Sequence, residues 1–154
     1  MIAYRREGPR IGVEAMCWEL VDGRETSGLA IDLSSSGLCI ERPYTGGQTR
    51  REVPLQLEIP GIDEVMWARG DVCFDVVVPV RSCRGGPLGL KPGGTPASPV
   101  GGAAAHGLLR RTGYRIVVAA QRDLRLIKDF VVETHRARRE AVIDYAVASC
   151  YARA

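Results

Sequence analysis

The chain has 154 residues, 45% of them hydrophobic and 25% charged, which is the usage of one globular domain with its own core. The formal net charge of +3 at pH 7 is too small for a protein that binds DNA or RNA through a broad basic surface. The five cysteines include no C-x-x-C pair, which argues against a zinc site and a disulfide framework.

Six segments have the residue patterns of β-strands: 11–20, 26–33, 38–41, 52–59, 65–80 and 114–120. Asp22-Gly23, between the first two, is a hairpin-turn signal. Alternate residues from Val53 to Ile59 share one apolar face, and Pro54 among them favours an edge position. We expect a mainly β fold in which six antiparallel strands close into a barrel, because closure removes exposed edges.

Residues 1–10 precede the barrel and are expected to form a flexible arm, since Gly8-Pro9 disfavours a helix there. The barrel domain is predicted to span residues 11–121. Within it, residues 85–107 contain eight Gly and four Pro in 23 residues, which predicts a flexible insertion in a hairpin.

From residue 122 the apolar period becomes helical, which predicts a long C-terminal helix over residues 122–151 that plugs or flanks one end of the barrel. Asp123 is a plausible N-terminal cap. The apolar pattern resumes after a charged stretch, at residues 141–151. That last part either packs on its own barrel or binds a partner or a second copy, which would give a homodimer.

Several classes of site are not expected. His106 and His135 lack neighbours that would complete a catalytic set, so we predict no enzyme, no catalytic residue, no metal site and no cofactor. The N-terminus lacks an apolar signal-peptide core, and the apolar runs at 76–80 and 116–120 are too short for membrane insertion. A cytoplasmic location is therefore expected. Cys17, Cys39 and Cys73 have apolar neighbours and are predicted to be buried thiols.

Two short motifs could bind a ligand. Arg6 and Arg10 form an R-x-x-x-R pattern in the arm, and Asp32, Ser34 and Gly37 form a D-x-S-x-x-G pattern at a turn between strands. Taken singly, the arginines can be merely solvated. The second pattern can be ordinary turn chemistry, with side chains bonded to the backbone and glycine at a positive φ.

In this order and within this strand pattern, the two motifs resemble the PilZ domain, a β-barrel family that binds cyclic di-GMP. The resemblance extends along nearly the whole chain. The late segment 112–116 is similar to a family strand, and the helix after it begins with Leu124, Ile127 and Phe130 on one stripe.

The resemblance implies a set of binding roles. Arg6 and Arg10 would clamp the phosphates and guanines of cyclic di-GMP, and Asp32 and Ser34 would bond guanine edges and the ligand backbone. Gly37 would allow close approach and hold the turn. Arg5 is at a position that can influence how many ligand molecules bind. The chemistry of these residue types agrees, because guanidinium matches phosphate and guanine acceptors and a carboxylate accepts from guanine N–H groups.

Three functions are compatible with these patterns. The first is a cyclic di-GMP receptor or adaptor that changes conformation on binding and signals to a protein effector in motility, pili, secretion or exopolysaccharide control. The second is a degenerate PilZ protein that binds no ligand and acts through protein contacts. The third is a barrel that binds RNA or single-stranded DNA, which is disfavoured because Trp18 and Trp67 are expected in the core. Binding of DNA or RNA is therefore not predicted.

Overall fold

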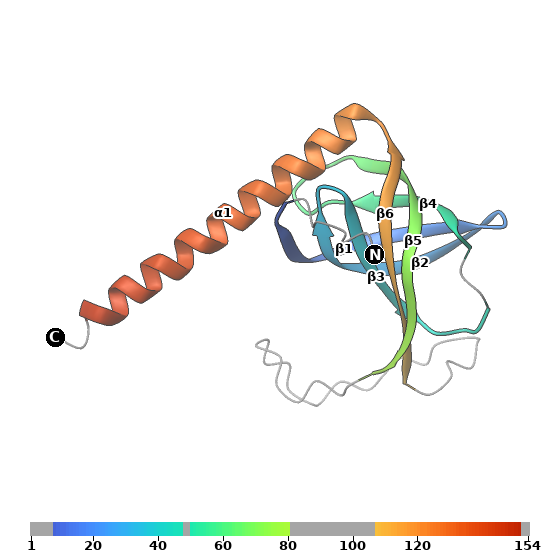
Figure 1. The fold of residues 1–154 in the computed structure, drawn as a ribbon, viewed down its shortest axis with the longest axis horizontal. Coiled ribbons are helices and arrows are strands. Elements are labelled where there is room, and N and C mark those ends of the chain that lie inside the picture. The colour runs from blue at the N-terminus through green and yellow to red at the C-terminus, as the bar shows by residue number, and fades with distance from the viewer. Residues whose placement is uncertain (1–7, 48–49, 81–106, 152–154) are drawn as a thin grey trace, which may run out of the picture.

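A computed structural model describes residues 8–47, 50–80 and 107–151. Over these residues the chain forms six strands and one helix: β1 (Arg10–Val21), β2 (Arg24–Ser34), β3 (Gly37–Pro43), β4 (Glu52–Glu58), β5 (Val65–Pro79), β6 (Leu108–Ala119) and α1 (Gln121–Tyr151). The strands pair antiparallel and close into a barrel in the order β1-β2-β3-β6-β5-β4 (Figure 1). The predicted fold class, a six-stranded antiparallel barrel followed by a long helix, is confirmed.

The hairpin between β1 and β2 follows directly from its sequence. Asp22 and Gly23 have φ angles of 54° and 72°, and they connect the paired residues Val21 and Arg24. Two consecutive positive φ values match the twist of the flanking strands, and Asp-Gly tolerates them better than most dipeptides do. The turn therefore sets the register that places the far ends of β1 and β2 side by side.

The barrel interior is filled by the apolar face of each strand. In β4 the alternation predicted from sequence is confirmed, since Val53, Leu55 and Leu57 are at most 4% exposed. Ile127 and Val131 of α1 join the same core at 1% and 0% exposure. The first half of α1 is therefore fixed to the barrel by apolar burial, while its second half extends away from it (Figure 1).

β6 begins at Leu108, six residues before the predicted start of the last strand. Its first part is polar, but the neighbouring strands supply partners: Arg110 bonds Asp75 in β5, and Arg111 bonds Glu41 in β3. The β5–β6 hairpin consequently reaches back to the pair Pro79 and Leu108. Residues 81–106, which include most of the predicted insertion at 85–107, lie outside the described residues.

The predicted cap of α1 is wrong. The helix begins at Gln121, and the amide of Leu124 donates to the carbonyl of Ala120 at 3.0 Å, so Ala120 is the residue that starts the helical hydrogen bonding. Asp123 lies in the first turn, where its carboxylate accepts a hydrogen bond from the amide of Trp67 at 3.5 Å. Asp123 thus connects the helix to β5 instead of capping it.

Three expectations about burial and edges are also wrong. Pro54 does not lie on an edge strand, because β4 pairs with both β1 and β5. The β1 ladder ends at Leu55, however, so the absent N–H of Pro54 leaves no gap in it. Trp67 is 53% exposed and Cys73 is exposed, because both side chains point outward from β5.

Candidate functional site

The end of the barrel where β1 starts and β2 ends brings the two motifs together. Arg10 is the first residue of β1 and pairs in register with Ser34, the last residue of β2. Ile11 and Leu33 are buried inside the barrel, so Arg10 and Asp32, one residue away, point outward. Nη1 of Arg10 lies 3.3 Å from Oδ2 of Asp32.

The structure therefore places the second arginine of R-x-x-x-R against the acidic residue of D-x-S-x-x-G. Arg5 and Arg6, the other predicted arm residues, lie outside the described residues.

Ser34 fixes the turn that follows β2. Its hydroxyl donates to the carbonyl of Gly37 at 3.1 Å and accepts from the amide of Ser36 at 3.4 Å. The residue is only 5% exposed, and these two bonds satisfy polar groups that the turn leaves without strand partners. Ser34 thereby holds the corner on which Asp32 is presented.

Gly37 lacks the positive φ that ordinary turn chemistry would give it, and its position is instead limited by a close strand contact. Its φ is not positive, so backbone conformation does not select glycine here. A Cβ at this position would lie 2.4 Å from the carbonyl oxygen of Tyr114, a backbone atom that cannot rotate away. Glycine allows β3 to approach β6 closely, and that approach closes the barrel beside the turn.

Asp32 presents an acceptor that the rest of the described chain does not use. Oδ2 faces Arg10, whereas Oδ1 is buried and has no hydrogen-bond partner among the described residues. A buried carboxylate oxygen without a donor is unfavourable, typically by about 1–3 kcal/mol or more for a charged group. A hydrogen-bond donor that reached this oxygen would remove that penalty.

A row of side-chain positions crosses the outside of the barrel from Asp32. The strand registers pair Asp32 with Cys39, Cys39 with Gly113, and Gly113 with Phe74. The ring of Phe74 lies over Gly113, where a Cβ would be 2.1 Å from it, and it is 42% exposed. The row therefore carries an exposed aromatic ring on the outside of the barrel, three strands away from Asp32.

Cationic groups border this row. Arg111 pairs with Glu41, and Nη2 of Arg115 lies 3.0 Å from Oδ2 of Asp71. Burial raises the pKa of the Cys39 thiol above its ordinary value of 9.0, which lowers the fraction of thiolate at neutral pH. The sequence did not place Phe74 and Arg111 on this outer face of the barrel, because the order and register of β3, β6 and β5 decide which residues lie there.

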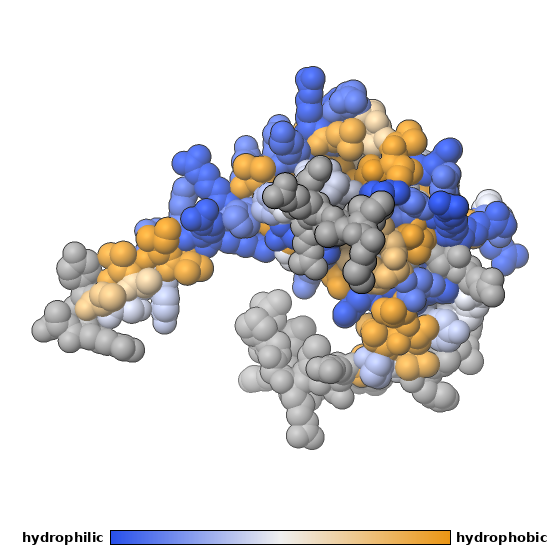
Figure 2. Space-filling model, in the orientation of Figure 1, coloured by the Kyte–Doolittle hydropathy of each residue, from blue (hydrophilic) through white to orange (hydrophobic). Residues whose placement is uncertain are grey.

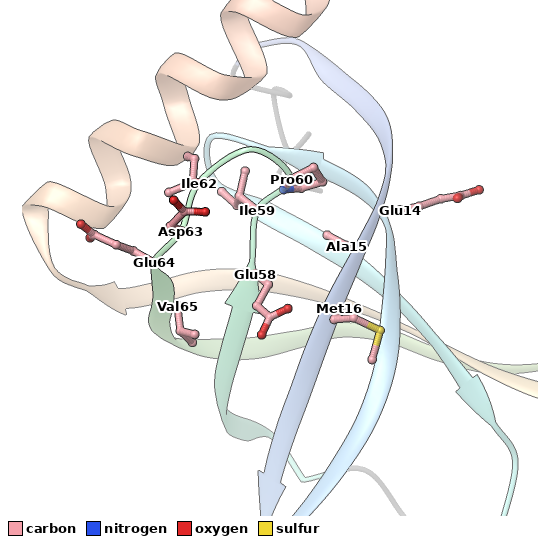
Figure 3. Close-up of a pocket in the computed structure, with 10 residues that line it drawn as sticks. All are labelled: Glu14, Ala15, Met16, Glu58, Ile59, Pro60, Ile62, Asp63, Glu64 and Val65. Carbon is pink, nitrogen blue, oxygen red and sulfur yellow. The ribbon is translucent and has the colours of Figure 1, made fainter.

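A cavity of about 450 Å³ lies elsewhere, between β1, the end of β4 and the segment leading into β5 (Figure 3). Its ten lining residues include four carboxylates, from Glu14, Glu58, Asp63 and Glu64, and no basic side chain. Negative charge at this density repels anionic ligands. This cavity is therefore unsuited to an anionic ligand, whereas the Arg10–Asp32 corner carries a basic side chain.

Among the described residues, no group of three or more His, Cys, Asp or Glu side chains could hold a metal ion. The part of the chain that the structure describes also contains no helix with the length and apolar character needed to span a bilayer.

The architecture defined by this barrel, turn and helix is a PilZ-like fold, and comparison with solved structures shows it. The PilZ domain of YcgR from Escherichia coli, solved with c-di-GMP, matches with a TM-score of 0.59 and 14% identity over 90% of this chain and 97% of that one. The inhibitor of motility MotI/DgrA from Bacillus subtilis matches with a TM-score of 0.61 and 11% identity over 89% of this chain. PlzA from Borreliella burgdorferi, solved in complex with c-di-GMP, matches with a TM-score of 0.54 and 7% identity over 87% of this chain.

The chain spans about half the length of two of these proteins, 54% of MotI/DgrA and 52% of PlzA. No family model matches the sequence, and no curated protein matches it in sequence. At sequence identities of 7%, 11% and 14%, these comparisons show similarity of the fold alone.

Proposed function

We propose that this protein is a receptor for cyclic di-GMP that catalyses no reaction and passes its state to a protein partner. The observation that carries the proposal is the contact between Arg10 and Asp32 at the Ser34–Gly37 corner of a PilZ-like barrel. Two of the structural neighbours, YcgR and PlzA, are solved with c-di-GMP, which supports this choice of ligand.

Each residue of the corner has a role in the proposed complex. Arg10, together with Arg6, binds phosphate oxygens and guanine acceptors, since a planar guanidinium offers paired donors to both. Asp32, whose side chain is 30% exposed, accepts from the guanine N–H edge through its carboxylate. Ser34 and Gly37 hold the turn in place, and Arg5 influences how many ligand molecules bind.

The signal in this proposal is an ordering of the N-terminal arm over the barrel when the ligand binds, which creates a new surface for a protein effector. One structural neighbour is an inhibitor of motility, so motility control is the first process to test, before pili, secretion and exopolysaccharide synthesis.

Isothermal titration calorimetry with cyclic di-GMP tests the proposal. Saturable binding that GTP and cyclic di-AMP do not reproduce would support it, and the fitted stoichiometry would address the role of Arg5. Absence of heat and of any ligand-dependent shift in melting temperature would refute the receptor function.

A second function, protein binding without a ligand, is favoured by one observation. The second half of α1 exposes large apolar side chains, with Val142 at 68%, Ile143 at 56% and Tyr145 at 76% exposure. Figure 2 shows hydrophobic surface on the part of the helix that extends from the barrel. Such a surface is suited to a protein partner or to a second copy. Light scattering of the wild type and of a Val142→Ser, Ile143→Ser, Tyr145→Ser variant would reveal a homodimer, and an unchanged monomer mass in both would exclude it.

A further inference from the structure

The middle of α1 contacts the barrel at β1, the strand that carries Arg10. Nη2 of Arg138 donates to the carbonyl oxygen of Gly12 at 2.8 Å. Gly12 is the register partner of Asp32, and it lies two residues from Arg10 on the same strand. Figure 1 shows the start of β1 beside the middle of α1. A residue of the helix thus contacts the strand pair that holds the Arg10–Asp32 contact.

Arg138 also lies on the outer face of β1 and β2, the face from which Arg10 and Asp32 point. Ile11 points into the barrel, so a side chain at Gly12 would point outward, as Arg10 and Asp32 do. A Cβ built on Gly12 would lie 3.9 Å from Nη1 of Arg138. The guanidinium of Arg138 therefore lies over Gly12, the register partner of Asp32, at ordinary van der Waals distance from the position of a Cβ.

A cavity of about 310 Å³ lies between the helix and the residue before Arg10. It is lined by Pro9 and by residues of α1: Val132, His135, Arg136, Arg139, Glu140 and Ile143. Nε of Arg136 bonds Glu140 at 2.9 Å, which offsets one of its positive charges. This volume is at the lower end of the roughly 300–1,000 Å³ of ligand sites. The lining does not include Arg138, Arg10 or Asp32, and it shows only that the helix face beside Pro9 is open and carries arginines.

We infer that α1 forms a third wall of the ligand site, and that Arg138 is a further binding residue, which donates to a phosphate of the cyclic dinucleotide while Arg10 and Asp32 hold its guanine. This inference rests on the proposed function and goes beyond the two sequence motifs. Three of the ten residues from 134 to 143 are arginines, and only one is acidic, so this stretch of helix is electropositive. A ligand bound there contacts the barrel and the helix together, which gives α1 a direct means of sensing occupancy.

The test is calorimetry with cyclic di-GMP on the full chain, comparing the wild type with Arg138→Gln and Arg138→Lys. Loss of one charge-assisted contact should weaken binding by about tenfold in Arg138→Gln, and the lysine should recover part of it. The matched control is Arg125→Gln, which removes an exposed arginine from the same helix far from the cavity and should leave the affinity unchanged. Equal melting temperatures of the free proteins would exclude a folding effect.

Hydrogen exchange supplies a readout that a merely structural arginine would not change. The ligand should slow amide exchange across residues 131–140 of α1 in the wild type, and it should not do so in Arg138→Gln. Wild-type affinity in Arg138→Gln, with binding lost in Arg10→Ala, would overturn the inference about the helix and leave the receptor function intact. If the wild type itself binds no cyclic di-GMP, both proposals fall together.

Discussion

Nη1 of Arg10 lies 3.3 Å from Oδ2 of Asp32, across the first paired residues of β1 and β2. The two side chains are 53% and 30% exposed, so the pair contributes little to the stability of the fold. The pair is exposed, and the other carboxylate oxygen of Asp32 has no hydrogen-bond partner among the described residues, so the pair is suited to binding a ligand. The first prediction concerns this pair.

Arg10→Ala and Asp32→Ala should each weaken cyclic di-GMP binding by roughly tenfold to a hundredfold, because each removes a charge-assisted hydrogen bond of about 1.5–3 kcal/mol. Arg10→Lys should fall between the wild type and Arg10→Ala, since lysine keeps the charge but loses the paired donors of guanidinium. Calorimetric titration measures all three.

Arg50→Ala is the matched control for this series. Arg50 pairs with Asp22 near the β1–β2 hairpin, at the opposite end of the strands, and both side chains are more than 60% exposed. Its removal should leave the affinity at the wild-type value. Unchanged affinity in both Arg10→Ala and Asp32→Ala would show that the ligand, if bound, lies elsewhere.

The second prediction concerns the close approach of β3 to β6. Gly37→Ala should lower the free energy of unfolding by roughly 1–3 kcal/mol, because the new Cβ meets the Tyr114 carbonyl oxygen and forces the strands apart. Gly12→Ala is the control for stability, since its Cβ would make only an ordinary contact at 3.9 Å. Urea denaturation of both variants measures the difference. Equal stability would mean that the backbone at Gly37 relaxes without cost.

Local patterns in the sequence were sufficient to predict the barrel, because each strand carries its own alternation and the Asp22-Gly23 turn carries its own conformational preference. The start of β6 could not be predicted in that way. Arg110 and Arg111 look like loop residues in isolation, and only the paired strands show that Asp75 and Glu41 compensate their charges.

In the candidate site, too, some residues are predicted from local sequence patterns and others depend on tertiary structure. Arg10, Asp32 and Gly37 lie on three successive strands joined by two tight turns, so the sequence motifs predict their spacing. The reason for glycine at position 37, however, is a tertiary contact. Arg138 approaches Gly12, beside Asp32, from α1. Phe74 approaches Gly113 on the outer face of the barrel from β5. Their approach depends on barrel register and helix direction, which no local pattern of a single sequence contains.

The third prediction concerns a charged pair inside the barrel. Glu19 is 1% exposed, and its carboxylate pairs with Arg42 and accepts a hydrogen bond from the hydroxyl of Tyr114. Arg42→Met should lower the free energy of unfolding by about 3–5 kcal/mol, since it leaves a buried carboxylate with one partner fewer. Tyr114→Phe should cost about 1–3 kcal/mol for the same reason.

Urea denaturation at neutral pH measures these losses, with Arg50→Met as the control. The Arg50–Asp22 pair is exposed, so that variant should lose less than about 1 kcal/mol. A loss in Arg42→Met no greater than in Arg50→Met would contradict the assignment of Glu19 and Arg42 as a buried ionic pair.

The fourth prediction is that the fold loses stability in alkaline solution. Burial, and then the nearby Glu19 carboxylate, raise the pKa of the Cys17 thiol above its ordinary value of 9.0 and that of the Tyr114 hydroxyl above 10.0. Above those ordinary values the unfolded chain releases protons that the folded chain retains, so unfolding becomes more favourable as pH rises. Below pH 9 the stabilising effect of these two groups is complete.

Each group should reduce the free energy of unfolding by up to about 1.4 kcal/mol per pH unit, beginning near pH 9 for Cys17 and near pH 10 for Tyr114. Urea denaturation between pH 7.5 and 10.5 should therefore show a plateau and then a decline. Cys17→Ala should flatten the decline between pH 9 and 10, because no thiol remains at that buried position. Cys73→Ala, at an exposed cysteine, should leave the slope as it is. A decline of equal steepness in Cys17→Ala would show that the alkaline loss arises from other groups than the thiol inside the barrel.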